Sequence, residues 1–546
     1  MMMDIPSFRL LRAAFLLMIL SVALNAEGLA NIVSAQIPGL FSYEFVVDEE
    51  GFTKVNITYT TNGARGSSWV LVPKFSEWTN HTVRGKVTEC GLRDAGELTG
   101  VPYFFYEALW FFYDSDGSEF EMNVQFNLST AAMIIEPDGV FYSPQIGFEE
   151  GRVEAEVTLP EGFSIKQGEA LALGSAGAYR PSSLGSDHVL FDNLPETENS
   201  FRIEIGFRTS GDEADLRTLQ SGVFAFETVP RYEGYAEEIL TLFNRTYGGL
   251  VELFNVTLET AEVRFFLPEF NSLFSPGGYV PFVSRQIGDI HINILYTRYV
   301  RGYIEVIALH ELVHHFLWKA GISPQTLLWF HEGMAEYISL EIANTLGYEG
   351  SRIMKEELEE GVSQLQQIVG DDFGFITQWS PSRQPENTGS YYVASYCVVS
   401  RLAEPRGGLE YYNRFFRLIK GKNVDSNAAI GYYLGLAANE SVADTLNRWG
   451  FEIPDLYRYA PLLSSAEEVL GKISPLHQPY KFLAELLYRQ ALLNANEESI
   501  AEMQLYLAAA LFIARLAPLL TLVTISGVLF GAIVLALSSR GVFSKH

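Results

Sequence analysis

Cysteine is nearly absent from the 546-residue chain, which has only Cys90 and Cys397. Two cysteines cannot build a disulfide framework or a thiolate zinc cluster, although one long-range bridge and two free thiols both remain open. Basic residues are also scarce, since 38 lysines and arginines stand against 66 aspartates and glutamates, for a formal net charge of −28. This deficit excludes a nucleic-acid binder, which needs a basic surface to meet phosphates. It also argues against docking onto anionic lipid by charge alone.

Charged residues make up only 19% of the chain, whereas hydrophobic residues make up 48%. A disordered protein would need the opposite balance, so the chain is globular. A chain of this length is too long for one small core, and it is expected to form several domains.

Both ends of the chain have the character of membrane segments. Arg9 and Arg12 precede a short apolar run, and small residues before Gln36 offer a cleavage site. Residues 1–35 are therefore predicted to be a secretory signal peptide or an uncleaved N-terminal anchor. The run Leu516–Leu537 has no charge and is long enough to cross a bilayer as a helix, which predicts a transmembrane segment at residues 516–537.

Arg540 and Lys545 follow this apolar run, in the tail at residues 538–546. Positive charge beside a membrane helix favours the cytoplasmic side, so the main part of the chain is expected outside the cell and the C-terminus inside it. Gly527 and Gly531 form a G-x-x-x-G pair that predicts a weak homodimer through the membrane helix. Six N-x-S/T triplets between the membrane segments predict a glycoprotein, at Asn56, Asn80, Asn127, Asn244, Asn255 and Asn439.

The sequence pattern between the two ends changes near residue 211. Residues 36–210 contain short alternating segments separated by turn residues, which predict a β-sandwich domain. Residues 211–460 contain a few strands followed by long amphipathic segments. Residues 461–505 are predicted to form a helical stalk that leads to the membrane. The expected fold class is therefore a multidomain α+β protein with one C-terminal transmembrane helix.

The candidate chemistry lies in the sequence His310-Glu311-Leu312-Val313-His314. Residues four apart share one helix face, so His310 and His314 can bind the same zinc ion. Glu311 lies beside them on the helix and can act as the general base on a water molecule held at the metal. This H-E-x-x-H pattern predicts a zinc hydrolase site.

A second amphipathic helix at Trp329–Tyr337 supplies the third ligand that a catalytic zinc needs, Glu332. Glu336 lies one turn further and is expected to hold the far nitrogen of His310, or else to be a surface charge. His315 is expected to pack in the core. His331 is expected to contact substrate.

This arrangement resembles the gluzincin metallopeptidases, the superfamily of thermolysin and aminopeptidase N. Their ligand glutamate stands in a pattern close to W-x-x-E-G-x-A-x-Y, matched here by Trp329, Glu332, Gly333, Ala335 and Tyr337. The 17 residues between His314 and Glu332 are one or two fewer than is usual in those families. The resemblance implies a thermolysin-like catalytic domain with one Zn²⁺ per chain and a peptide or protein as substrate.

The resemblance also implies an oxyanion-stabilising tyrosine on a later helix, for which Tyr392 is the best match and Tyr391 the alternative. Aminopeptidases of this superfamily carry a G-x-M-E-N stretch whose glutamate binds the substrate amine, but Pro276–Pro281 contains no glutamate. Endopeptidase and aminopeptidase activity therefore both remain open. Ile290–Leu295 is expected to form the strand at the edge of the cleft.

The sequence thus predicts a membrane-anchored extracytoplasmic zinc metallopeptidase with Glu311 as base and Tyr392 as oxyanion donor. Two alternatives stay open. One is a cell-surface binding protein on a peptidase-like scaffold, and the other is a zinc hydrolase of non-peptide bonds.

Overall fold

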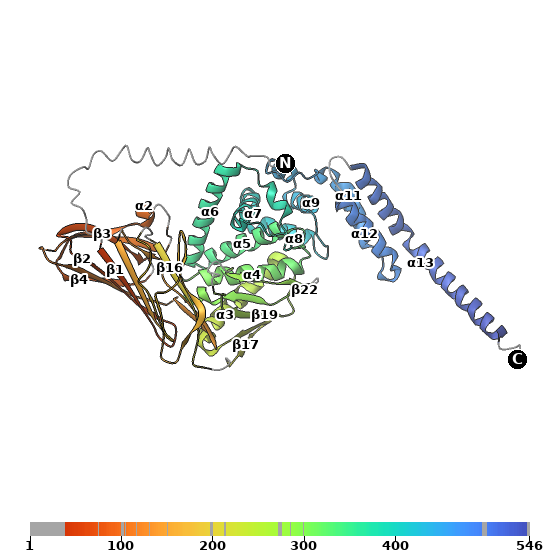
Figure 1. Ribbon diagram of the computed structural model, residues 1–546. Helices are drawn as coiled ribbons and strands as arrows, with labels where there is room; N and C mark the ends of the chain where they lie inside the picture. The colour runs from red at the N-terminus through yellow and green to blue at the C-terminus, as the bar shows by residue number, and fades with distance from the viewer. Residues whose placement is uncertain are drawn as a thin grey trace, which may run out of the picture. The chain divides into compact units, whose positions relative to one another are not determined.

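The computed structural model describes residues 39–542 except positions 75, 100–102, 104, 116, 130, 150, 197–199, 212–214, 271–275, 284–285, 299 and 494–499. The predicted signal peptide or anchor at residues 1–35 lies outside the described residues, as does Lys545. The chain divides into two compact units, Met1–Asp212 and Glu213–His546 (Figure 1).

Alternating sequences form the strands of the N-terminal unit. β1 (Gly39–Val47) and β2 (Thr53–Thr61) bury every second side chain, because successive residues of a strand point to opposite faces. β1 pairs antiparallel with β2 and parallel with β11 (Gly151–Thr158). The other strands are β3 (Arg65–Pro73), β4 (Trp78–Arg84), β5 (Lys86–Asp94), β6 (Tyr106–Asp114), β7 (Phe120–Leu128), β8 (Ala132–Ile135), β9 (Asp138–Tyr142), β10 (Ile146–Gly147), β12 (Ser164–Gly174), β13 (Gly177–Tyr179), β14 (Ser183–Leu184), β15 (His188–Phe191) and β16 (Ser200–Arg208), and a short helix is α2 (Ala95–Thr99).

Among the described residues, these strands form three sheets. Seven strands follow the order β14-β15-β11-β1-β2-β7-β4, six are built around β13-β12-β16-β9-β8, and three follow β3-β6-β5. Phe41, Phe111 and Phe141 come from the three different sheets, and all are fully buried in one hydrophobic core. The predicted β-sandwich is confirmed in its packed sheets, and the third sheet is an addition that the turn pattern did not predict.

The C-terminal unit begins with a five-stranded sheet in the order β17-β18-β19-β23-β20. Helix α3 (Glu233–Phe254) packs against β18, and α4 (Tyr303–Lys319) packs against β23. The strands are β17 (Arg217–Ser221), β18 (Phe224–Thr228), β19 (Ala261–Phe266), β20 (Gly278–Tyr279) and β23 (Ile290–Asn293), and a separate hairpin contains β21 (Phe282–Val283) and β22 (Gln286–Ile287).

The expectation that Ile290–Leu295 forms the edge strand is wrong. β23 pairs with β19 on one side and with β20 on the other, so β20 is the edge. The backbone N–H of Asn293 donates to the carbonyl of Gly277 at 2.8 Å. The glycine-rich segment before Pro281 therefore pairs with the strand that was predicted to be the edge, and takes the edge position itself.

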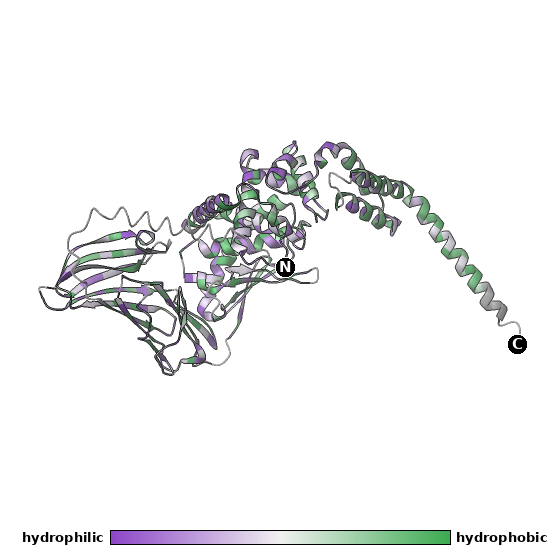
Figure 2. Cartoon of the chain, turned by 45° about the horizontal axis from the view of Figure 1, so that its top comes forward, coloured by the Kyte–Doolittle hydropathy of each residue, from purple (hydrophilic) through white to green (hydrophobic). Residues whose placement is uncertain are grey.

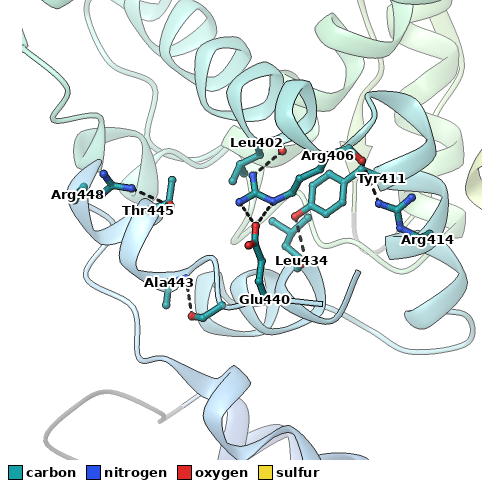
Figure 3. A network of polar contacts seen from close by, with 10 residues as sticks. Leu402, Arg406, Tyr411, Arg414, Leu434, Glu440, Ala443, Thr445 and Arg448 are labelled. Carbon is teal, nitrogen blue, oxygen red and sulfur yellow. Dashed lines mark hydrogen bonds and ion pairs between the residues drawn. The ribbon is translucent and has the colours of Figure 1, made fainter. Parts of the chain in front are cut away.

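Helices form the rest of this unit, and polar contacts fix several of them together. Arg406 donates to Glu440 from Nε at 3.0 Å and from Nη2 at 2.7 Å, and to the carbonyl of Leu402 at 3.0 Å (Figure 3). Tyr411 donates to the carbonyl of Leu434 at 3.1 Å. These contacts join α7 (Thr388–Ala403), α8 (Leu409–Leu418) and α9 (Asn427–Ala438), and the neighbouring helices are α5 (Leu328–Thr345), α6 (Glu349–Val369) and α10 (Ala443–Arg448).

The chain ends in α11 (Ala460–Gly471), α12 (Tyr480–Leu493) and α13 (Ile500–Val542). Ile500–Ala536 of α13 is long and apolar enough to cross a membrane (Figure 2), so the predicted single apolar C-terminal helix is present among the described residues. Both cysteines are free thiols, Cys90 at the surface and Cys397 buried.

Candidate metal centre

His310, Glu311 and His314 lie on α4, a helix that is buried along nearly its whole length. The Glu305 carboxylate accepts the backbone N–H of Gly302 at 2.7 Å and so satisfies one free donor where the helix begins. Apolar residues occur on every side of the helix, and nearly all of them are buried. The polar side chains at 310, 311 and 314 are therefore buried with them. Each of these three side chains belongs to a residue that is less than a tenth exposed.

Helix α5 brings Glu332 to the two histidines. Its first turn is anchored by the fully buried Trp329, whose indole N–H donates to Asn427 Oδ1 at 2.8 Å. One turn later, Glu332 Oε2 lies 3.2 Å from His310 Nε2 and 3.5 Å from His314 Nε2. The ligand atoms of the three residues all lie within 4.8 Å of one another.

This donor set fits a zinc ion. Zinc binds imidazole nitrogen and carboxylate oxygen at about 2.0–2.2 Å in a tetrahedron, which places neighbouring ligand atoms about 3.3–3.6 Å apart. The two measured distances from Glu332 Oε2 are close to that spacing. Two histidines and one glutamate also leave a fourth position open, as a catalytic zinc site requires.

Glu336 fixes the orientation of His310. Its Oε2 lies 3.2 Å from His310 Nδ1. A carboxylate accepts a hydrogen bond, so Nδ1 of His310 carries the proton and Nε2, which faces Glu332, keeps a lone pair when the ring is neutral. The alternative that Glu336 is a surface charge does not match its position against this ring.

His331 occupies the equivalent place beside His314, which sequence reasoning did not find. His331 is fully buried, and its Nε2 lies 3.0 Å from the carbonyl of Ile322. A carbonyl only accepts, so Nε2 of His331 is protonated and its Nδ1 accepts from His314 Nδ1 at 3.4 Å. Nε2 of His314 is then the atom with a free lone pair. The expectation that His331 contacts substrate is wrong, because no surface of it is exposed.

Nothing local in the sequence marks this pairing. The imidazole rings of His314 and His331 stack at an interplanar angle of 21°, with Phe282 of β21 set edge-on to both. Three separate segments must be packed before this contact exists. His315 is 6% exposed, and burial and His314 lower its pKa to about 4, so it packs in the core as a neutral ring, as expected.

Helix α7 brings Tyr392 to the centre because α5 and α7 approach closely. A Cβ at Gly333 would lie 2.5 Å from the carbonyl oxygen of Ser395, so only glycine permits this crossing. Tyr392 lies one turn before Ser395. The Glu332 carboxylate, burial and the Glu311 carboxylate, in that order, raise the pKa of the Tyr392 phenol well above its usual value.

The two neighbouring tyrosines share one contact and differ in the others. Trp379 packs on both rings, at 5.6 Å between centroids for Tyr391 and 5.0 Å for Tyr392, whereas Phe375 packs on Tyr391 at 4.9 Å. The carboxylates of Glu332 and Glu311 act on the Tyr392 phenol, so Tyr392 is the tyrosine near the candidate ligands.

The electrostatics of the centre favour a cation. Burial alone raises the pKa of Glu332, but His314 and His310 outweigh it and hold that pKa well below its usual range. Burial alone lowers the pKa of His310, but Glu332, Glu336 and Glu311 outweigh it and hold that pKa well above its usual value. Three carboxylates around two imidazoles therefore stabilise positive charge, whether it arrives as a proton or as a divalent ion.

Glu311 is the carboxylate of this group that is not paired with a ring nitrogen. Burial raises its pKa to about 7, although His310 and His314 oppose that rise. A Cβ at Gly278 would lie 2.8 Å from Glu311 Oε1, so the glycine leaves room for this carboxylate under the edge strand β20. A carboxylate that titrates near neutral pH is well suited to accept and return a proton.

No family model and no curated protein matches the chain. The chain is similar to the solved structure of yeast LTA4 hydrolase in complex with bestatin, at 13% identity and a TM-score of 0.31, covering 91% of this chain and 86% of that one. It is also similar to native yeast LTA4 hydrolase, at 12% identity and a TM-score of 0.29, covering 82% and 74%. Likeness at this level establishes neither the family nor the chemistry of the chain.

Proposed function

We propose that the chain is a zinc metallopeptidase, anchored in the membrane by α13 with its site outside the cell. The observation that carries the proposal is the buried cluster of His310, His314 and Glu332, with Glu311 beside it. A zinc ion held by these three residues would act as a Lewis acid and lower the pKa of a water molecule.

Each residue around that ion has a separate role in proton transfer or hydrogen bonding. Glu311 takes a proton from the attacking water and returns it to the leaving amine, so one carboxylate serves as base and then as acid. The Tyr392 phenol, whose raised pKa keeps it protonated, donates a hydrogen bond to the oxygen that gains negative charge at the scissile carbonyl. Glu336 and His331 keep one ring nitrogen of each histidine ligand protonated and the other free.

The outward orientation rests on the charges near the chain ends. Arg540 and Lys545 follow the apolar run and favour the cytoplasm, and residues 1–35 have the composition of an export signal. The Gly527 and Gly531 backbones have open space around them. The weak homodimer through these two glycines stays a proposal.

The full chain in detergent provides the test of function. Bound zinc is measured by elemental analysis, and cleavage is followed on a peptide mixture with free or acetylated amino termini. Cleavage of both forms would assign an endopeptidase, and cleavage of free amines alone an aminopeptidase. Zinc binding without cleavage of any peptide would contradict the proposal and favour a binding scaffold or a hydrolase of other bonds.

Replacing Tyr392 by phenylalanine is expected to lower kcat by roughly 10²–10³-fold, the usual cost of removing one oxyanion donor. Zinc content should not change, because the phenol is not one of the three ligands. Tyr391→Phe is the matched control and should leave kcat near the wild-type value, because phenylalanine keeps the ring that packs on Phe375. Equal effects of the two substitutions would contradict the role given to Tyr392.

Replacing His331 by phenylalanine is expected to weaken zinc affinity by roughly 10- to 100-fold, as losses of a partner to a histidine ligand usually do. The ring volume is kept, but His314 loses the acceptor that fixes its tautomer. His315→Phe is the control, since His315 is also buried and lies next to His314 on α4. Competition with a zinc-binding dye measures both affinities. An unchanged affinity in His331→Phe would remove the orienting role of that ring.

A further inference from the structure

The start of α12 lies alongside the apolar part of α13. His477 Nδ1 lies 3.3 Å from Thr521 Oγ1, and the Tyr480 hydroxyl contacts Thr524 Oγ1. Both threonine hydroxyls donate to carbonyls of their own helix, at 2.7 and 2.8 Å. Each threonine has only one hydroxyl proton, so the imidazole and the phenol are the donors of the contacts between the helices.

The two helices run antiparallel and pack closely. The buried residues of α13 recur every three or four positions, and most of them are alanine, which lets the helices approach: Met503, Leu507, Ala510, Ala514 and Ala517. On α12, Ala484, Tyr488 and Ala491 are buried. The hairpin therefore has a well-formed interior, and its tip is fastened beside residues 521–524.

The depth of that tip follows from helix geometry. The uncharged run of α13 begins at Leu516, so Thr521 and Thr524 lie about 8–12 Å along it at 1.5 Å per residue. The hydrocarbon core of a bilayer is about 30 Å thick. Whatever medium surrounds the first turns of the run also surrounds the start of α12.

The outward face of the tip is apolar. Leu476 is 82% exposed and Phe482 is 62% exposed, values like the 63% of Leu522 in the apolar run itself. Leu483 and Leu486 extend this exposed face. Large apolar side chains gathered at such exposure mark a surface that meets another apolar phase.

Charge is sparse at the same level. Residues 475–486 contain two charged side chains of opposite sign, Lys481 and Glu485, and Lys481 Nζ lies 3.9 Å from Glu485 Oε1. A lysine stem can lie along apolar surface while its ammonium group reaches water. The polar atoms of His477 and Tyr480 that contact α13 are satisfied, as an apolar medium requires.

We propose that this tip, residues 475–486, enters the outer leaflet of the bilayer beside α13 and forms a second membrane contact. The proposal rests on the anchor proposed above, whose ribbon is coloured as hydrophobic over most of its length (Figure 2). Leu519, Leu522 and Val523 of α13 are exposed to a similar degree as the apolar residues of the tip. The occupant is lipid, since the exposed apolar side chains of tip and anchor lie at one depth.

The tip is also joined to the helices that hold the metal centre. Glu467 of α11 accepts from Tyr488 of α12 at 2.7 Å and from Tyr433 of α9 at 2.5 Å. The first residue of α9, Asn427, accepts from Trp329 at the start of α5. The metal centre is therefore connected to the lipid contact by packed, hydrogen-bonded helices rather than by a free tether.

A fluorescent depth measurement tests the proposal on the full chain. Cys90 is exposed and is replaced by serine, whereas Cys397 is buried and stays. Single cysteines are introduced by Phe482→Cys and Leu476→Cys in the tip, Leu529→Cys in the anchor and Ile368→Cys as control. Ile368 on α6 is 81% exposed and so matches Leu476. Each is labelled with an environment-sensitive dye in phosphatidylcholine vesicles that carry doxyl-labelled lipid.

Labels at 476, 482 and 529 are expected to be quenched at least threefold more than the label at 368. Quenching at 529 alone would overturn the inference while leaving the anchor intact. No quenching at 529 would instead remove the anchor on which the inference rests, and the inference with it. A blue-shifted tip label without lipid quenching would show that protein, such as a second copy, covers the tip, and would also overturn the inference.

Discussion

Glu311→Gln is expected to lower peptide cleavage by roughly 10²–10⁴-fold while one zinc ion per chain remains bound. Glutamine has nearly the same shape as glutamate but cannot accept a proton. The site has little room for a larger change, because Glu311 is only 4% exposed and lies against Gly278. The three candidate ligands are untouched. The effect should therefore fall on kcat, measured with the peptide mixture, and not on zinc content.

Glu305→Gln is the matched control for this substitution. Glu305 is on the same helix, is also buried, and has a pKa raised by burial, but its carboxylate caps Gly302 instead of facing the ligands. Its replacement should change stability more than kcat. If both variants lost activity equally, the loss would reflect damage to α4 and not removal of a base.

The pH profile gives a second measurement of the same group. Glu311 must be ionised to accept a proton, so kcat/KM should fall as the pH drops below the pKa of that carboxyl. Burial raises the pKa to about 7, and a bound cation lowers it, so the acid limb should lie below pH 7. The residual activity of Glu311→Gln should lack this limb.

The parts of this centre that the sequence predicted are those set by helix periodicity. His310, Glu311 and His314 are fixed relative to one another by one turn of α4, and Glu332 and Glu336 by one turn of α5. Composition and length likewise predicted the apolar C-terminal helix. These features depend on residues close together in the chain, so spacing alone is informative about them.

The parts that were missed depend on contacts between distant segments. The pairing of His331 with His314 depends on which face of α5 is turned toward α4. The edge position of β20 depends on the backbone path of a glycine-rich segment, in which few side chains give a sequence pattern. The close crossing of α5 and α7 depends on Gly333, whose role becomes visible only when Ser395 is beside it. Motif spacing contains no information on any of these three contacts.

Replacing Glu332 by glutamine is expected to weaken zinc affinity far more than replacing Glu336 by the same residue. The Glu332 side chain is 10% exposed and the Glu336 side chain 14%, and each carboxylate contacts His310 at 3.2 Å. They differ in the nitrogen they face. Glu336 faces Nδ1, so its loss should cost roughly 10- to 100-fold, the usual effect of losing a partner that orients a ligand.

Glu332 faces Nε2 of both histidines, where the ion would lie. Its replacement removes one of three donors and also the negative charge that opposes the cation, so the loss of affinity should exceed 100-fold and leave the purified chain without zinc. Glutamine keeps the volume of the side chain, so thermal unfolding should remain cooperative in both variants. Competition with a zinc-binding dye ranks the two affinities directly. A larger loss in Glu336→Gln than in Glu332→Gln would mean that the cation lies on the Nδ1 side of His310, and the ligand set proposed here would be incorrect.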